Sequence, residues 1–237
     1  MSLRAVRAFH AVKPELHRIG AGQRLVVVVD GLIDDLQPVV GLAAALAPFP
    51  VATNDYPGVR RVIAAHEPAN VYVAALMNAA APFIAGAFDC DAFRVIEASF
   101  SMVTRAPAAL SPQQRAPHFD STDPQFIAVL HYLSAPGGGG TAFFRQLATG
   151  IEQVSDGNVD LFVRTATKLA RAQRLDAGYV RPDDPHYEML LAVPAVAGRT
   201  LIYQGSLLHS GLIPPSAPLS ADPRIGRLTG NFFLKLG

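Results

Sequence analysis

Residues 117–144 read PHFDSTDPQFIAVLHYLSAPGGGGTAFF, and this stretch decides most of the fold. His118 and Asp120 precede an apolar run, FIAVLHYL, which four glycines at residues 137–140 separate from a second run, TAFF. Short runs of β-branched and aromatic residues between turn signals are typical of a β-sandwich or barrel. We therefore predict two strands joined by a tight hairpin turn at the glycines, with His118 and Asp120 on extended chain ahead of them.

Further strands are predicted on both sides of this stretch. Apolar, β-branched or alternating runs occur at residues 24–30, 93–103, 187–196, 199–211 and 227–236. Residues 49–61, which are rich in Pro, Asn, Asp and Gly, are expected to form a surface loop.

Helical patterns occur in three places, at residues 34–46, 71–88 and 159–174. We expect the second helix in two pieces, because Pro82 lies inside it. The third belongs to an insertion at about residues 151–175 and carries a basic face. The chain is therefore predicted to be α+β and a single domain: residues 1–92 supply a strand and helices, and residues 93–237 form a β core with the helical insertion.

Composition excludes several classes of protein. Half of the 237 residues are hydrophobic and 16% are charged, which is typical of a globular chain. The formal charge of +1 gives no basic excess for nucleic acid. Cys90 is the only cysteine, so an intramolecular disulfide and a Cys-rich zinc site are excluded. A single cysteine fits a reducing compartment, and we expect a cytoplasmic protein.

Two segments bear on membrane targeting. The first twenty residues have scattered charges and no continuous apolar core, so they do not read as a signal peptide. Residues 71–88 are uncharged and approach the length of a membrane-spanning helix. Asn78 and Pro82 lie inside that run, so we interpret it as a buried core helix and expect no membrane partner.

One constellation of residues carries chemistry. Side chains alternate along extended chain, so His118 and Asp120 point the same way. His209, at the end of another predicted strand, can complete a set of two imidazoles and one carboxylate with open positions opposite, as in the facial triad of non-haem iron(II) oxygenases. The same ligands would suit a zinc hydrolase or a non-catalytic, cupin-like binding protein, and both alternatives stay open.

A predicted anion site lies beyond the triad. Arg227 and Thr229 should share one face of the last strand, and a guanidinium fork is the natural partner of a dicarboxylate's far carboxylate. Tyr132 can add a hydrogen bond from an inward strand position. Arg224 is a competing cation in a nearby turn, and the choice between Arg224 and Arg227 stays open at this point.

The stretch 117–144 resembles the iron(II)/2-oxoglutarate-dependent dioxygenase superfamily, and its prolyl-hydroxylase-like branch in particular. The resemblance is carried by His118-x-Asp120, by Tyr132-Leu133-Ser134, by the Gly-Gly turn and the following Thr-x-Phe, and by SLLHSG around His209. It is specific over residues 118–144 and 198–236. It departs from compact members in the insertion and in a long gap between His209 and the terminal arginine.

The resemblance implies a double-stranded β-helix, or jelly roll. It further implies Fe(II) on His118, Asp120 and His209, 2-oxoglutarate on Tyr132 and Arg227, and use of molecular oxygen to hydroxylate a substrate. It does not name that substrate, because function lies in loops added to a fold. An amino acid, a peptide and a small metabolite all stay open, as does a homodimer.

Positions relative to the site are also predicted for several further side chains. Tyr56 and Arg60, in the predicted loop, could line a substrate mouth. Leu130, Phe143 and Phe232 are expected to form apolar walls around the metal. His131 should point away from the site, because it neighbours the inward Tyr132.

Overall fold

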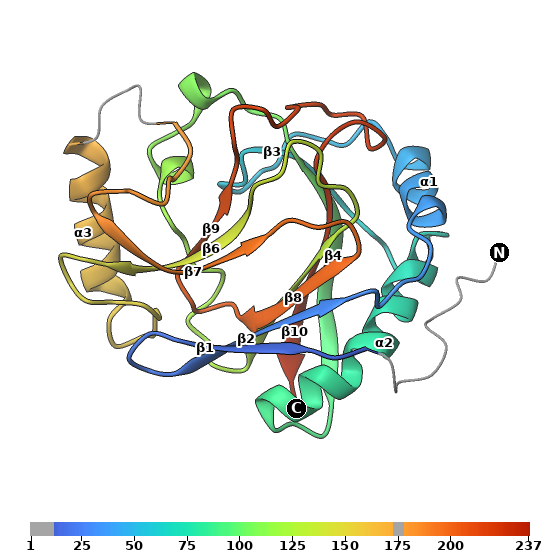
Figure 1. Ribbon diagram of the computed structural model, residues 1–237, viewed down its shortest axis with the longest axis horizontal. Helices are drawn as coiled ribbons and strands as arrows, with labels where there is room; N and C mark the ends of the chain where they lie inside the picture. The colour runs from blue at the N-terminus through green and yellow to red at the C-terminus, as the bar shows by residue number, and fades with distance from the viewer. Residues whose placement is uncertain (1–11, 173–177) are drawn as a thin grey trace.

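Two facing antiparallel sheets form the protein, as the computed structural model of residues 12–172 and 178–237 shows (Figure 1). Residues 1–11, on which the signal-peptide interpretation was based, and residues 173–177, which include the end of the predicted insertion, lie outside the described residues. The seven-stranded sheet runs in the order β1 (Glu15–Ile19), β2 (Arg24–Asp30), β8 (Arg199–Gln204), β5 (Phe126–Tyr132), β10 (Leu228–Leu236), β4 (Phe93–Val103) and β3 (Gly58–Val62). The three-stranded sheet consists of β7 (Tyr187–Pro194), β6 (Gly140–Gln146) and β9 (His209–Leu212). This is the predicted α+β chain with a double-stranded β-helix core.

Helices cover the outer faces of the two sheets. α1 (Gln37–Ala45) and α2 (Asn70–Phe88) lie on one side of the molecule, and α3 (Val159–Ala172) lies on the opposite side (Figure 1). Two short 3-10 helices, η1 (Pro107–Ala109) and η2 (Gln113–Arg115), precede the His-x-Asp segment.

The large sheet has two distinct faces because alternate residues of each strand point to opposite sides. Its outer face packs against α1 and α2 in the main hydrophobic core, where Tyr72 of α2 stacks on Phe100 and meets Phe232 edge-on. Fully burying one such side chain contributes roughly 1.5–3 kcal/mol. Phe232 therefore belongs to the outer core, and its predicted place in the wall of the metal site is wrong. Phe233, the next residue, lies on the inner face.

α2 differs from its prediction. The helix is continuous across Pro82, which was expected to divide it. A proline inside a helix costs about 3 kcal/mol, and here burial of Ala79, Ala80 and Ile84 on the same helix offsets that cost. Among the described helices, α2 alone has the length and apolar composition that would allow a membrane crossing. In the fold, its buried side chains pack on the large sheet.

Three other local predictions were wrong. The predicted loop at residues 49–61 ends in the edge strand β3, whose Arg60 and Arg61 masked its β character. The glycines do not form a hairpin, because β5 and β6 belong to different sheets. Gly139, at φ +83°, connects the sheets, and a Cβ there would lie 2.1 Å from the carbonyl oxygen of Leu212. The predicted strand at 199–211 likewise divides into β8 and β9.

Candidate metal centre

The backbone brings the two histidines together. His118 and His209 form an isolated antiparallel bridge that adds His118 to the edge of the small sheet beside β9. The amide of His118 donates to the carbonyl of His209 at 2.9 Å, and the reverse bond measures 2.8 Å. The imidazole centroids lie 4.4 Å apart. His209 begins β9, whereas the sequence placed it at a strand end.

Asp120 completes the cluster. Its backbone amide donates to the carbonyl of Gly205 at 2.7 Å, two residues along from the His118 bridge. The carboxylate oxygens lie 4.0 Å from Nε2 of His118 and 3.7 Å from Nε2 of His209. One ligand atom from each of the three residues lies within 4.8 Å of the other two.

Phe119 anchors this segment from behind. It lies between the two inward ligands and points to the other side, where its ring meets Phe162 of α3 edge-on with centroids 5.7 Å apart. Alternation along the extended chain, as predicted, gives His118 and Asp120 a common direction. The helical insertion therefore supports the position of both side chains.

The electrostatics of the cluster fit a divalent cation. Nδ1 of His209 lies 2.9 Å from the carbonyl of Leu207, and a proton donated there leaves the lone pair of Nε2 free for a metal. Among the described residues, the buried Oδ2 of Asp120 has no hydrogen-bond partner. Burial raises the pKa of Asp120 to about 6 and lowers the pKa of His209 to about 4. A bound cation would stabilise the carboxylate that burial otherwise disfavours.

Gly205 is needed for this arrangement. A Cβ at this position would lie 2.7 Å from Cδ1 of Phe126 and 3.2 Å from Cβ of Asp120. We expect Gly205→Ala to displace Asp120 and to weaken the affinity for a divalent metal ion about tenfold, the scale seen when a residue that orients a metal ligand is changed. Gly86→Ala is the control, since a Cβ in that part of α2 meets nothing within 4 Å. Isothermal titration under anaerobic conditions measures both, and equal affinities would contradict the role of Gly205.

A row of inward side chains crosses the large sheet. In register, Arg60 of β3 pairs with Ser101 of β4, Ser101 with Thr229 of β10, and Thr229 with Tyr132 of β5. His131 points to the opposite face, as predicted, and its Nδ1 lies 2.8 Å from the hydroxyl of Tyr72.

Arg227 lies two residues before Thr229 of this row, just ahead of β10. Its side chain is buried, Nη2 donates to the carbonyl of Gly140 at 2.9 Å, and the buried Nε has no partner among the described residues. The guanidinium carbon lies 5.1 Å from the centre of the Tyr132 ring. The hydroxyl of Tyr132 lies 2.6 Å from Oγ1 of Thr141. A guanidinium with an unused donor beside hydroxyl groups is suited to bind an anion.

Arg224, the competing arginine, lies elsewhere. It is exposed, and its backbone amide donates to the carboxylate of Asp222 within the turn. The tertiary structure therefore brings Arg227, and not Arg224, beside Tyr132.

The two loop residues expected at a substrate mouth occupy different places. Burial raises the pKa of the Tyr56 phenol to about 12, opposed by the charge of Arg227 and by a hydrogen bond with Thr229, so Tyr56 belongs to the Arg227 pocket. Arg60 forms an ion pair with Glu97 and lies over the ring of Phe233.

The apolar surroundings of the cluster come from both sheets. Tyr203 meets the His209 ring edge-on at 4.9 Å, and Phe143 lies 6.3 Å from it, centroid to centroid. Leu130 packs against the same inner cluster. The inner positions of Phe143 and Leu130 agree with the prediction from the sequence. Tyr203 was missed, because the sequence of a strand does not show which distant residue an aromatic side chain will contact.

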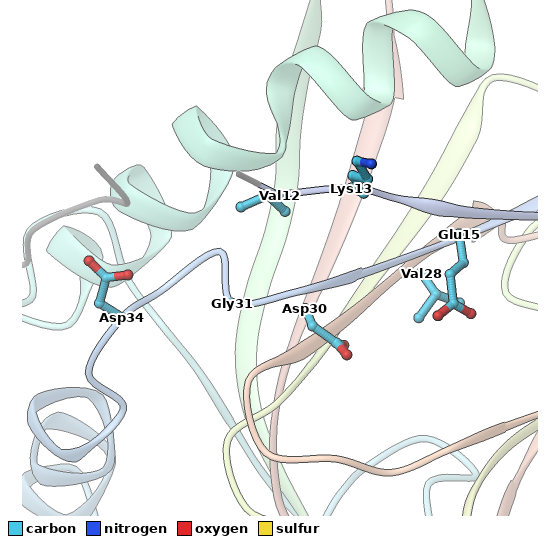
Figure 2. Close-up of a pocket in the computed structure, with 7 residues that line it drawn as sticks. All are labelled: Val12, Lys13, Glu15, Val28, Asp30, Gly31 and Asp34. Carbon is cyan, nitrogen blue, oxygen red and sulfur yellow. The ribbon is translucent and has the colours of Figure 1, made fainter. Parts of the chain in front are cut away.

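A separate hollow lies beside β1 and β2. Figure 2 shows its carboxylates, Glu15, Asp30 and Asp34, near the start of the described chain. Asp30 is paired with Arg199 through two hydrogen bonds of 2.8 Å. None of the predicted site residues lines this hollow.

Comparison with known proteins identified one matching family model and several solved structures with a similar fold. The model of a family described as "Family of unknown function (DUF6445)" matches residues 10–234. The search of curated proteins found no match.

Solved structures with a similar fold include HygX from Streptomyces hygroscopicus. Its complex with nickel and 2-oxoglutarate has a TM-score of 0.51 at 15% identity, covering 89% of this chain and 82% of HygX. The complex that also holds hygromycin B has a TM-score of 0.50 at 14% identity, with the same coverage. Collagen prolyl hydroxylase vCPH from Paramecium bursaria Chlorella virus-1, with 2OG, has a TM-score of 0.49 at 12% identity, covering 90% and 96% of the two chains. The likeness to HygX shows a shared fold, which confirms the predicted resemblance at that level.

Proposed function

The chain belongs to the DUF6445 family, which has no assigned function, and we propose that this member is an iron(II)- and 2-oxoglutarate-dependent oxygenase. The observation that supports the proposal most is the presence of a three-ligand cluster, in which His209 is buried and His118 exposed, together with a buried guanidinium. The triad offers three ligand atoms within 4.8 Å of one another. The buried guanidinium of Arg227, with its unpartnered Nε, offers an anion site beside Tyr132.

The residues present fit both groups. His118, Asp120 and His209 would hold the iron, since two imidazoles and a carboxylate leave open positions for further ligands. Arg227 and Tyr132 would bind the far carboxylate of 2-oxoglutarate, and the hydroxyl of Thr229 would support them. When bound, iron(II) and 2-oxoglutarate supply the oxidising chemistry: 2-oxoglutarate, oxygen and a C–H group give succinate, carbon dioxide and a C–OH group.

The protein itself contributes orientation and exclusion of water. Leu130, Phe143 and Tyr203 surround the cluster with apolar surface, which limits access of solvent to the reacting groups. The backbone bridge between His118 and His209 holds both imidazoles on rigid elements.

Anaerobic spectroscopy tests the proposal. Iron(II) and 2-oxoglutarate added together should give a weak visible charge-transfer band, which either one alone, or zinc with 2-oxoglutarate, should not give. Admission of oxygen should then produce succinate. Absence of the band in a folded, iron-loaded sample would contradict the proposal and would favour a cupin-like binding protein.

Tyr56 gives a sharper test of the cosubstrate pocket. Its hydroxyl lies with Thr229 and Arg227, and a hydrogen bond to a charged group is worth about 1.5–3 kcal/mol. We expect Tyr56→Phe to raise the dissociation constant of 2-oxoglutarate about tenfold or more. Tyr72→Phe is the matched control, because its hydroxyl lies 2.8 Å from Nδ1 of His131 on the outer face of the large sheet. Titration of the charge-transfer band measures both, and similar values for the two variants would contradict the assignment of Tyr56.

A further inference from the structure

Among the described residues, the inner face of the large sheet carries an ion pair next to Phe233 that the proposed iron and cosubstrate sites do not use. Arg60 of β3 and Glu97 of β4 bind each other through Nη2 and Oε1. Val59 and Ala98, the neighbours in sequence, belong to the outer core, so alternation directs Arg60 and Glu97 to the inner face. Two opposite charges are thus held side by side within the β-helix.

This pair lies on the Asp120 side of the candidate metal centre. The guanidinium of Arg60 lies 5.8 Å from the centre of the Phe233 ring, and Phe233 packs on Phe126 with centroids 5.2 Å apart. Phe126 in turn lies against Gly205, which backs Asp120.

The strand register places Glu97 away from the cosubstrate pocket, whereas the backbone of Arg60 lies level with Thr229 through Ser101. On β10, Thr229 lies level with Tyr132, whereas Phe233 lies level with Glu97 and Ala128, four residues further along the strand. Arg227, which precedes Thr229, is further still from Glu97. The Glu97 end of the pair is therefore distinct from the anion site at Arg227, while Arg60 lies between the two.

We propose that Arg60 and Glu97 bind the carboxylate and ammonium groups of a free α-amino acid, which is the substrate of this site. The inference rests on the proposed oxygenase function. It makes Arg60 and Glu97 specificity-determining residues, with the ring of Phe233 beneath the guanidinium.

The charge pattern favours a zwitterion over singly charged ligands. Within the described residues, the pair engages only one guanidinium nitrogen and one carboxylate oxygen, so both partners keep capacity for hydrogen bonds. An anion alone would meet the repulsion of Glu97, and a cation alone that of Arg60, whereas a zwitterion complements both. Arg60 and Glu97 side chains are 16% and 33% exposed, so these charges are only partly screened by water.

The next residue of β3 provides a matched control. Arg61 forms the same kind of ion pair with Glu67, and alternation along β3 directs it away from Arg60. Neutralising Arg61 removes one positive charge from the same strand without touching the inner face.

The substrate class is tested by the rate of succinate formation. Iron(II), 2-oxoglutarate and oxygen are supplied with an equimolar mixture of the twenty L-amino acids, which is then resolved into single compounds. We expect at least one amino acid to raise the rate about tenfold over the substrate-free reaction, and its N-acetyl and amide derivatives to lose that stimulation. No stimulation by the mixture, or equal stimulation by the blocked derivatives, overturns the proposal.

Variants then test which charged residue binds which group of the amino acid. Glu97→Gln should collapse the preference for the free amino acid over its N-acetyl derivative, and Arg60→Gln should collapse the preference over its amide, while Arg61→Gln keeps both. Unchanged preferences in the first two variants also overturn the proposal. The charge-transfer band separates the outcomes: if it is absent from the wild type, the oxygenase function fails, and if it is present without amino-acid stimulation, only this inference fails.

Discussion

Asp120→Asn is expected to abolish iron(II) binding and yet to leave the metal-free protein at least as stable as the wild type. Burial raises the pKa of Asp120 to about 6 from 3.8, so the fold disfavours the ionised carboxylate. Because the folded-state pKa is the higher one, this destabilisation is absent below about pH 4 and complete above about pH 6. Two pKa units correspond to roughly 3 kcal/mol, of which a neutral amide would recover part.

Thermal unfolding at pH 8 measures both halves of this expectation. In a chelator, Asp120→Asn should unfold at the wild-type temperature or several degrees higher, since 1 kcal/mol shifts the midpoint by about 2–4 °C in a chain of this size. Anaerobic iron(II) should raise the midpoint of the wild type alone, because a ligand stabilises only the state that binds it.

Asp123→Asn is the control for that experiment. Asp123 lies three residues further on, in an ion pair with Lys235 that lowers its pKa. Its loss should cost at most about 1 kcal/mol, as for other exposed pairs, and should leave iron affinity intact. A strong iron-dependent shift in Asp120→Asn would show that the carboxylate is not a ligand.

Arg227→Gln is expected to weaken 2-oxoglutarate binding on the order of 100-fold, while iron(II) affinity is kept. Two charge-assisted hydrogen bonds of about 1.5–3 kcal/mol each would be lost from a buried site. Arg224→Gln should have no effect, because Arg224 is exposed in its turn. Arg227→Lys should retain part of the affinity, since it keeps the charge and loses the planar fork.

Titration of the charge-transfer band with 2-oxoglutarate measures all three variants, and circular dichroism checks that Arg227→Gln is folded. The opposite pattern, with loss of affinity in Arg224→Gln and normal affinity in Arg227→Gln, would move the cosubstrate to another site.

The errors made from the sequence share a physical cause. Turn signals are local, so the four glycines could not show whether the chain folds back on itself or crosses to the other sheet. β3 was missed because an edge strand tolerates polar residues such as Arg60 and Arg61. Phe232 was misplaced although alternation from Arg227 and Thr229 already directs Phe233, and not Phe232, to the inner face.

The sequence by itself determined the class of fold and the candidate ligands, because alternation along an extended chain depends only on local geometry. Alternation directed His118 and Asp120 to a common side of their segment and directed His131 away from the site. Only the tertiary structure decided which distant groups meet: His209 opposite His118, Arg227 rather than Arg224 beside Tyr132, and Arg60 against Glu97 near Asp120. Those contacts depend on strand order and on how the two sheets pack against each other. Both are determined jointly by residues far apart in the chain, so no local sequence pattern encodes them.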